Sequence, residues 1–379
     1  MPTGLLKPLA PQPWPPSPLV PTTPSPYDPA ARAAPSADGR ARHVLPTKKG
    51  VELVIAFIAP GQGSQTPGML AAWLRDPALA ARVRAWSEAA DVDLVHLGTR
   101  ASAAEVARTE NTQPLLVAQG LLAHEQFEEP GERGQPGQPG EHGEASAVAA
   151  GHSVGEITAA ACAGVLSPTD AVRLAAIRGR AMADACAVVP TSMAAVVGGD
   201  ESDTLAAIAE HGLTAATFNG AGQIVAAGLA EDLRRLAARP PAGSTVKPLK
   251  VAGAFHTRHM EPARRRLAAA AAVTPFRPPR GLLLSNADGE PLTRPETIRR
   301  RLVDQVVQPV RWDLCLCALG RIAPDVTVAL PPSRTLANLV RRRLPGLFVM
   351  SVSTPGDLPR VRARLTAASR TRGATHAGL

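Results

Sequence analysis

Ser153 combines a residue type and a spacing that suit nucleophilic chemistry. It lies in the segment G-H-S-V-G-E at 151–156, which contains the pattern G-x-S-x-G. This pattern is typical of a serine on a tight turn between a strand and a helix. The flanks fit, because a short apolar run precedes the turn (145–150) and an alanine-rich run follows it (157–166). The hydroxyl would then lie at a helix N-terminus, where N–H groups stabilise developing negative charge.

A second glycine-rich turn, P-G-Q-G-S-Q at 60–65, follows the apolar run at 51–59. That run predicts a buried parallel strand, and glycines at its end let backbone N–H groups approach a ligand. No G-K-[ST] follows, which argues against a Walker A phosphate loop. A nucleophilic serine on such a turn needs an N–H donor from another loop. We therefore expect this turn to supply one.

His256 ends the segment G-A-F-H at 253–256, after a predicted strand at 245–252. A lone histidine is more often a surface or structural residue than a catalytic one. At the end of a strand, however, it is placed as a general base would be, and its pKa near neutrality suits proton transfer.

Arg178 lies in I-R-G-R-A-M at 177–182, on an amphipathic helix that Pro168 can begin. An arginine on a helix is normally solvated, and we expect Arg173 and Arg180 to be so. A guanidinium on the buried face would instead bind a carboxylate through two parallel hydrogen bonds.

Five motifs in this order resemble the malonyl-CoA:acyl carrier protein transacylases, in particular the stand-alone bacterial acyltransferases. They are G-Q-G-S-Q, G-H-S-V-G-E, R-G-x-x-M, N-G-A-G-Q-I-V-A-A-G and G-A-F-H-T-x-H-M, and the resemblance runs from about Val51 to about Pro359. In that family G-A-F-H accompanies malonyl rather than methylmalonyl selectivity. The resemblance implies transfer of malonyl from malonyl-CoA through a seryl ester to the phosphopantetheine thiol of acyl carrier protein, in fatty-acid or polyketide synthesis.

The resemblance also implies a role for each matching position. Ser153 would be the nucleophile, His256 the general base and Arg178 the clamp for the malonyl carboxylate. The remaining expectations are backbone oxyanion donors at Gln62 and Val154, a histidine-orienting main-chain carbonyl at Gln305, and an acyl pocket lined by His152, Met182 and Phe255. No permanently bound cofactor and no metal ion are expected.

The expected fold class is α/β. The family implies an α/β-hydrolase-like core with a parallel sheet, and the pattern of 191–251 predicts an inserted ferredoxin-like β-α-β-β-α-β subdomain. The predicted domains are a disordered proline-rich tail (1–49), a core (50–190 and 252–359) with a glycine-rich loop (129–144), the small subdomain (191–251) and a frayed basic tail (360–379).

The formal net charge of +9 comes from the ends of the chain: residues 1–49 carry +4 and residues 360–379 carry +5. The remainder is formally neutral, which argues against a nucleic-acid-binding face. Arginine triplets at 264–266, 299–301 and 341–343 are mostly solvated in our interpretation, but one can meet an acidic carrier protein or CoA phosphates. No apolar run approaches the ~20 residues of a membrane span. We expect a cytoplasmic, monomeric enzyme with reduced cysteines and no membrane or nucleic-acid partner.

One segment departs from the family. The usual E-x-G-P-G-x-x-L near the C-terminus is replaced by A-L-P-P-S-R-T-L at 329–336, which lacks the acid and both glycines. Proline at 331 restricts the backbone and removes a donor, which puts the loop near the His256 side of the cleft in question. The altered loop and the extra tails keep open a non-catalytic acyltransferase-like partner subunit. A serine hydrolase that edits acyl thioesters also stays open, because Arg178 favours a carboxylated acyl group but does not exclude water as the acceptor.

Overall fold

The computed structural model describes residues 53–127 and 146–376. The tail predicted at 1–49 and the loop predicted at 129–144 lie outside these residues. All elements below belong to one compact unit, Leu45–Leu379.

The larger sheet has parallel strands at its centre, as the sequence predicts. Its order is β11 (Val349–Ser351), β10 (Val326–Ala329), β1 (Val54–Ala59), β2 (Ser146–Gly151), β7 (Leu282–Leu284) and β8 (Pro291–Leu292). Only the β7–β8 pair is antiparallel among these described strands. The apolar run around β1 thus forms the buried central strand that was expected, and the α/β fold class is confirmed.

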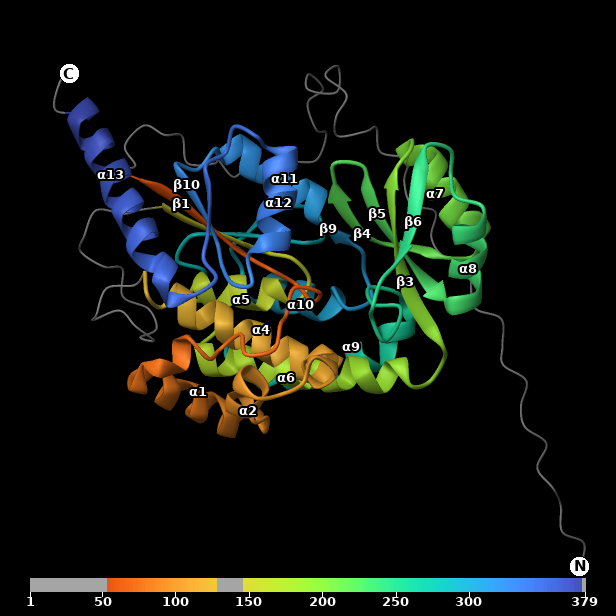
Figure 1. Cartoon of the computed structure of the whole chain (residues 1–379), viewed down its shortest axis with the longest axis horizontal. Helices are drawn as coiled ribbons and strands as arrows, with labels where there is room; N and C mark the ends of the chain where they lie inside the picture. Colours follow the sequence, from red (N-terminus) through yellow and green to blue (C-terminus); the bar gives the residue numbers. More distant parts are fainter. Residues whose placement is uncertain (1–52, 128–145, 377–379) are drawn as a thin grey trace, which may run out of the picture. The chain divides into compact units, whose positions relative to one another are not determined.

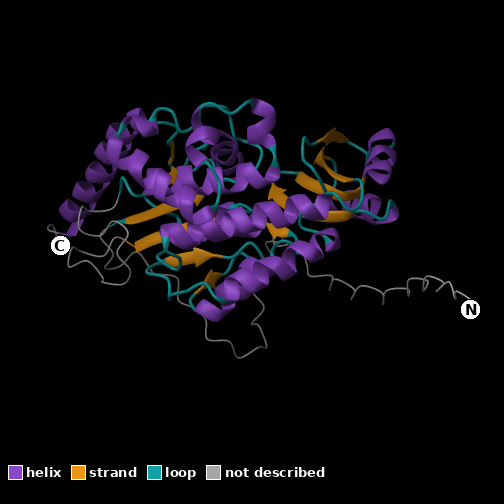
Figure 2. Cartoon of the chain, turned by 90° about the horizontal axis from the view of Figure 1, so that it is seen from below, coloured by secondary structure: helices purple, strands orange, loops and turns teal. Residues whose placement is uncertain are grey.

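Helices cover both faces of this sheet (Figures 1 and 2). Outside the connections of the smaller sheet, the described α-helices are α1 (Pro77–Ala90), α2 (Leu94–Thr99), α3 (Ala103–Ala107), α4 (Thr109–His124), α5 (Gly155–Cys162), α6 (Pro168–Cys186), α9 (Glu261–Ala272), α10 (Pro295–Asp304), α11 (Trp312–Ile322), α12 (Arg334–Arg343) and α13 (Leu358–His376). None of the helices in the described ranges is both long and apolar enough to span a bilayer.

The alternation of side chains along β1 explains the two layers. Phe57 and Ala59 pack into the core that contains α4, α5 and α6, whereas Ala56 and Ile58 pack into the core that contains α11 and α12. In Figure 1, α4, α5 and α6 lie below this sheet and α11 and α12 lie above it. A strand buried on both faces must be apolar throughout, which is the pattern in its sequence.

The smaller sheet, at the right of Figure 1, has the order β6 (Ser244–Pro248), β3 (Thr191–Gly198), β5 (Gln223–Leu229), β4 (Thr214–Gly220) and β9 (Val310–Arg311). Two helices, α7 (Glu201–Glu210) and α8 (Ala230–Ala238), connect its strands in the predicted β-α-β-β-α-β order. Ile208 and Leu236 from these helices pack on Ala194 and Val196 of β3. One prediction needs correction, because β6 ends at Pro248 rather than continuing to 252.

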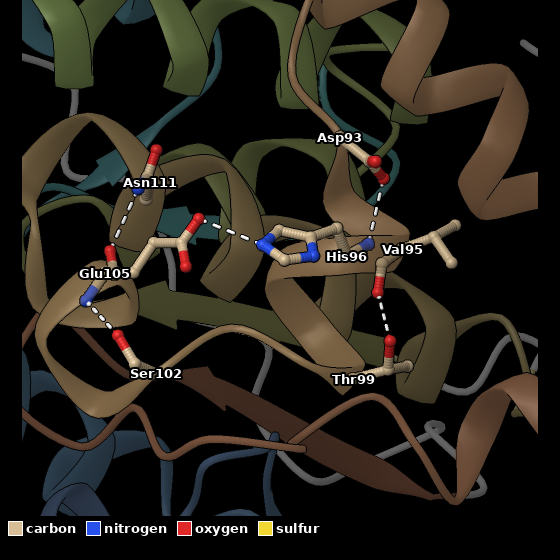
Figure 3. Close-up of polar contacts among 7 residues, drawn as sticks. All are labelled: Asp93, Val95, His96, Thr99, Ser102, Glu105 and Asn111. Carbon is tan, nitrogen blue, oxygen red and sulfur yellow. Dashed lines mark hydrogen bonds and ion pairs between the residues drawn. The ribbon is translucent and has the colours of Figure 1, made fainter.

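A polar corner between α2 and α4 fixes the start of α4 (Figure 3). Asp93 accepts a hydrogen bond from the backbone N–H of His96 at 2.9 Å, and Ser102 accepts one from that of Glu105 at 3.2 Å. The side chains of His96 and Glu105 then meet at 3.0 Å, which joins the two short helices. Asn111, in the first turn of α4, donates to the main-chain oxygen of Glu105 at 2.9 Å. These caps and bridges hold the first turn of α4 against α2 and α3.

The departing segment at 329–336 connects β10 to α12. The N–H of Leu330 donates to the oxygen of Ile58 at 2.9 Å, so the segment stays joined to β1. C-terminal to this segment, the prediction of a frayed tail is wrong for residues 360–376, because α13 runs over Leu358–His376. Val361 is fully buried and Leu365 packs on the main core, so the apolar positions of this basic segment anchor it.

Candidate active site

The turn that carries Ser153 joins β2 to α5, as the G-x-S-x-G pattern predicts. Ser153 has a φ of 56°, which L-residues rarely adopt. A Cβ at Gly151 would overlap the carbonyl of Gly155, and a Cβ at Gly155 would overlap the carbonyl of Ala59. The two glycines therefore let the turn close on itself and against the end of β1, which projects the serine from a crowded backbone.

His256 meets this serine, with 2.7 Å between its Nε2 and the Oγ of Ser153. On the other side of the ring, Nδ1 lies 2.7 Å from the main-chain oxygen of Gln305. Burial, and then the positive charge of Arg178, lower the pKa of His256 to about 3. The ring is therefore neutral at neutral pH, and the carbonyl assigns its proton to Nδ1. Nε2 is left as an acceptor for the serine hydroxyl, the arrangement of a general base.

Arg178 approaches the same oxygen from α6. Its side chain is 1% exposed, and Nη2 lies 3.3 Å from the Oγ of Ser153. Nη1 donates to the Oε1 of Gln113 at 2.7 Å, and Nη2 donates to the Oε1 of Gln305 at 2.9 Å. Burial lowers the pKa of the guanidinium to about 10, opposed by the charge of Glu156, so it stays charged at neutral pH.

The other two arginines of α6 lie elsewhere. Arg173 pairs with Asp170 at 2.7 Å, and Arg180 donates to the main-chain oxygen of Ala90 at 3.1 Å. The buried arginine beside the serine is therefore the one that the motif singled out. His256 does not follow a strand directly, since β6 ends at Pro248 and a loop carries the chain to the site.

Asn286 and Glu156 support the turn from behind, and sequence reasoning gave neither of them a role. Asn286 accepts the N–H of Ser153 at 2.9 Å and donates to the main-chain oxygen of Gly151 at 2.6 Å. The carboxylate of Glu156 accepts the N–H of Asn286 at 2.9 Å and the side-chain amide of Gln305. Burial raises the pKa of Glu156 to about 7.

A signal for Asn286 exists in the sequence. It follows the apolar run of β7, which is a neighbour of β2 in the sheet. Polar residues at the carboxyl ends of adjacent parallel strands gather at one edge of a sheet, where ligands bind.

The predicted oxyanion donors lie where two loops meet. Val154 precedes α5 as its N-cap residue, and Gln62 follows Gly61 in the turn after β1. A Cβ at Gly61 would stand 2.7 Å from the oxygen of His152, so this turn touches the serine turn closely. The N–H groups of Gln62 and Val154 take no part in the hydrogen bonds that join the described turns and loops. These two N–H groups therefore remain the candidates for the oxyanion donors.

The three predicted pocket residues have different surroundings. His152 Nε2 lies 2.8 Å from the Oδ1 of Asn219 on β4, so the serine turn is joined to the smaller sheet. Met182 is buried on α6, where its sulfur accepts the side-chain amide of Gln113 at 3.4 Å. Phe255, next to His256, is 6% exposed.

This site lies in a fold of the acyl transferase class, because the family model for the acyl transferase domain matches residues 56–346. A malonyl CoA-acyl carrier protein transacylase of Mycobacterium tuberculosis is 47% identical over 305 residues, covering 80% of this chain and 98% of the relative. The chain therefore belongs to the malonyl CoA-acyl carrier protein transacylase family.

Solved structures agree with this assignment. The crystal structure of the M. tuberculosis enzyme has a TM-score of 0.75 and 47% identity, and the match covers 80% of this chain and 98% of that one. A second structure is that of a malonyl-transacylase in complex with the acyl carrier protein of a type II polyketide synthase. It has a TM-score of 0.72 and 28% identity, with 84% of this chain and 99% of that one covered.

Proposed function

We propose that this protein transfers the malonyl group of malonyl-CoA to the phosphopantetheine thiol of an acyl carrier protein, for fatty-acid synthesis. The observation that carries the proposal is the position of the Ser153 Oγ, 2.7 Å from the Nε2 of His256 and 3.3 Å from the Nη2 of Arg178. A base and a carboxylate-binding cation at one hydroxyl suit a substrate that has both a thioester and a free carboxylate.

In the first half-reaction, the hydroxyl of Ser153 gives its proton to His256 as the oxygen attacks the thioester carbonyl. The N–H groups of Gln62 and Val154 would receive the negative charge on the carbonyl oxygen, and losing one such donor typically costs about 3–4 kcal/mol. The intermediate collapses with cleavage of the C–S bond, and His256 returns the proton to the CoA thiolate.

The second half-reaction reverses these steps with a different thiol. The phosphopantetheine sulfur loses its proton to His256, attacks the seryl ester and leaves malonyl on the carrier protein. The serine oxygen then recovers the proton. Because a thiolate is a good leaving group, the main-chain carbonyl of Gln305 is sufficient to orient His256. No carboxylate is required beside its Nδ1.

We further place this protein in the cytoplasm as a monomer that meets malonyl-CoA and the carrier protein in turn. The support is the membership of the chain in the malonyl CoA-acyl carrier protein transacylase family. The acyl carrier protein as partner is supported by the carrier complex of the related malonyl-transacylase.

Incubation with labelled malonyl-CoA, with and without carrier protein, separates the proposed transferase from its alternatives. The transferase places the label on the carrier protein. A hydrolase releases free malonate at a rate that the carrier protein does not change, and a non-catalytic subunit does neither. Label on the carrier protein that depends on this protein supports the proposal, and either other outcome overturns it.

A further inference from the structure

Arg178 is a buried cation without a directly paired acid. In the described part of the chain, its hydrogen-bond partners are two amide oxygens, on Gln113 and Gln305, and the hydroxyl of Ser153. A buried guanidinium is usually paired with a carboxylate, because an uncompensated charge is costly to bury. The neutral partners therefore need an explanation.

The acid in this network, Glu156, lies one amide group away from Arg178. Nη2 of Arg178 donates to the Oε1 of Gln305 at 2.9 Å, and the Nε2 of the same amide donates to the carboxylate of Glu156. The side chain of Gln305 thus separates the guanidinium from the carboxylate while it bonds to both. The same residue supplies, through its main chain, the oxygen that contacts His256.

Gln113 holds the opposite side of the guanidinium. It is 1% exposed, and its Oε1 receives Nη1 of Arg178 at 2.7 Å while its Nε2 faces the sulfur of Met182 at 3.4 Å. The orientation of the amide is fixed by these neighbours, because the reverse orientation would set its NH₂ group against the donors of Arg178. Its helix, α4, is held at its start by the polar corner described above.

We propose that the side chains of Gln113 and Gln305 are specificity-determining positioning groups, which fix the guanidinium of Arg178 with neutral oxygens and so leave its charge for a substrate carboxylate. This inference rests on the proposed function, in which that carboxylate belongs to the malonyl group. If a glutamate occupied either position, the guanidinium would already be neutralised, and a carboxylated substrate would have to displace it.

The same arrangement disfavours acyl groups without a carboxylate. An acetyl group would leave the desolvated charge of Arg178 with amide partners only. The site therefore selects malonyl in two ways. The malonyl carboxylate pairs with Arg178, and an acyl group without a carboxylate leaves the buried charge of Arg178 unpaired.

The experiment measures the affinities of malonyl-CoA and acetyl-CoA by calorimetry in the Ser153→Ala background, where no ester can form. Gln113→Glu replaces the amide with a carboxylate of the same shape beside Arg178. We expect it to lower the malonyl-to-acetyl affinity ratio by at least about tenfold, in line with the loss of a close charge pair. The matched control is Gln119→Glu on the same helix, because Gln119 is 2% exposed and its amide contacts the main-chain oxygen of Met69 instead. That control should leave the ratio within about twofold, the usual limit of coupling between sites that share no partner.

If Gln113→Glu does not fold, Gln113→Met decides, because it withdraws the positioning oxygen without adding charge. It should lower the ratio in the same direction. The inference is overturned if the Gln113 variant that folds has the same malonyl-to-acetyl affinity ratio as the Ser153→Ala background. It is also overturned if the Gln119 control changes this ratio as much as the Gln113 variant does. Failure of the proposed function is seen separately, as wild-type protein that does not load malonyl on the carrier protein.

Discussion

Nδ1 of His256 lies 2.7 Å from the main-chain oxygen of Gln305, so a peptide carbonyl stands where a serine–histidine–aspartate triad has a carboxylate. The carbonyl fixes which ring nitrogen carries the proton but brings no full charge to stabilise an imidazolium. The neutral histidine is thus oriented to accept the proton of Ser153, 2.7 Å away from Nε2. This orientation suits a reaction whose leaving group is already good.

His256→Ala should slow formation of the malonyl ester by about 10²–10⁴-fold, the usual contribution of a positioned general base. The measurement is the rate of ester formation after rapid mixing with malonyl-CoA. His259→Ala is the control, because His259 lies in the same segment and its backbone, not its ring, bonds to Thr257. Equal rates for the wild type and His256→Ala would remove His256 from the proton transfer.

Arg178→Ala should move the acidic limb of the pH profile to higher pH. Burial is the first cause of the low pKa of His256 and the charge of Arg178 is the second, so removing that charge raises the pKa. Because the base acts only when deprotonated, activity would then be lost at a higher pH than in the wild type. The measurement is the pH profile of kcat/KM with acetyl-CoA. This substrate has no free carboxylate, so the profile is not affected by the loss of carboxylate binding in Arg178→Ala.

Arg180→Ala is the control for this profile, because Arg180 is on the same helix but donates to the main-chain oxygen of Ala90. It should leave the acidic limb in place. An acidic limb that stays fixed in Arg178→Ala, or moves to lower pH, would contradict the electrostatic coupling between Arg178 and His256.

Gly155→Ala should destabilise the protein by about 3 kcal/mol or more, the upper end of overpacking costs. The added Cβ would overlap the main-chain oxygens of Ala59 and Pro60, and backbone cannot move aside as a side chain can. Denaturant unfolding measures the change. Gly346→Ala is the matched control, because a Cβ there meets nothing within 4 Å. Similar midpoints for both variants would mean that the serine turn is not tightly packed against β1.

The serine turn was predictable because its requirements are local. Glycines on both sides of Ser153, an apolar strand before it and a helix after it are all visible within residues 145–166. The small sheet was predictable for a similar reason, since its strands and helices alternate with clear periodicity. Arg178 needed the family motif as well, because Arg173 and Arg180 share its helix; in the structure, its burial separates it from them.

The support behind the site was not predictable in the same way. Gln113 and Asn286 are 65 and 133 positions from their partners Arg178 and Ser153, and neither belongs to a motif that marks its role. Their function arises from tertiary contacts. The end of β6 was misjudged because the apolar residues Leu249 and Val251 continue the strand pattern, although they pack against the core from a loop.

The C-terminal helix was missed for an electrostatic reason. Residues 360–379 carry five arginines and no acid, a pattern that predicts a frayed basic tail. Val361 is nevertheless fully buried and Leu365 packs on the core, at a spacing of four that places them on one helix face. Two apolar positions among many charges carry too weak a periodic signal to be seen in the sequence alone.

The central claim is that Ser153 carries the malonyl group, and intact-protein mass spectrometry after incubation with malonyl-CoA tests it most directly. Wild-type protein should gain one malonyl group, which is lost again when carrier protein is added. Ser153→Ala removes a single oxygen, so it should keep the fold and the unfolding midpoint but gain no malonyl. A malonylated Ser153→Ala protein, or a wild-type protein that loads the carrier protein without ever carrying malonyl itself, would contradict the account.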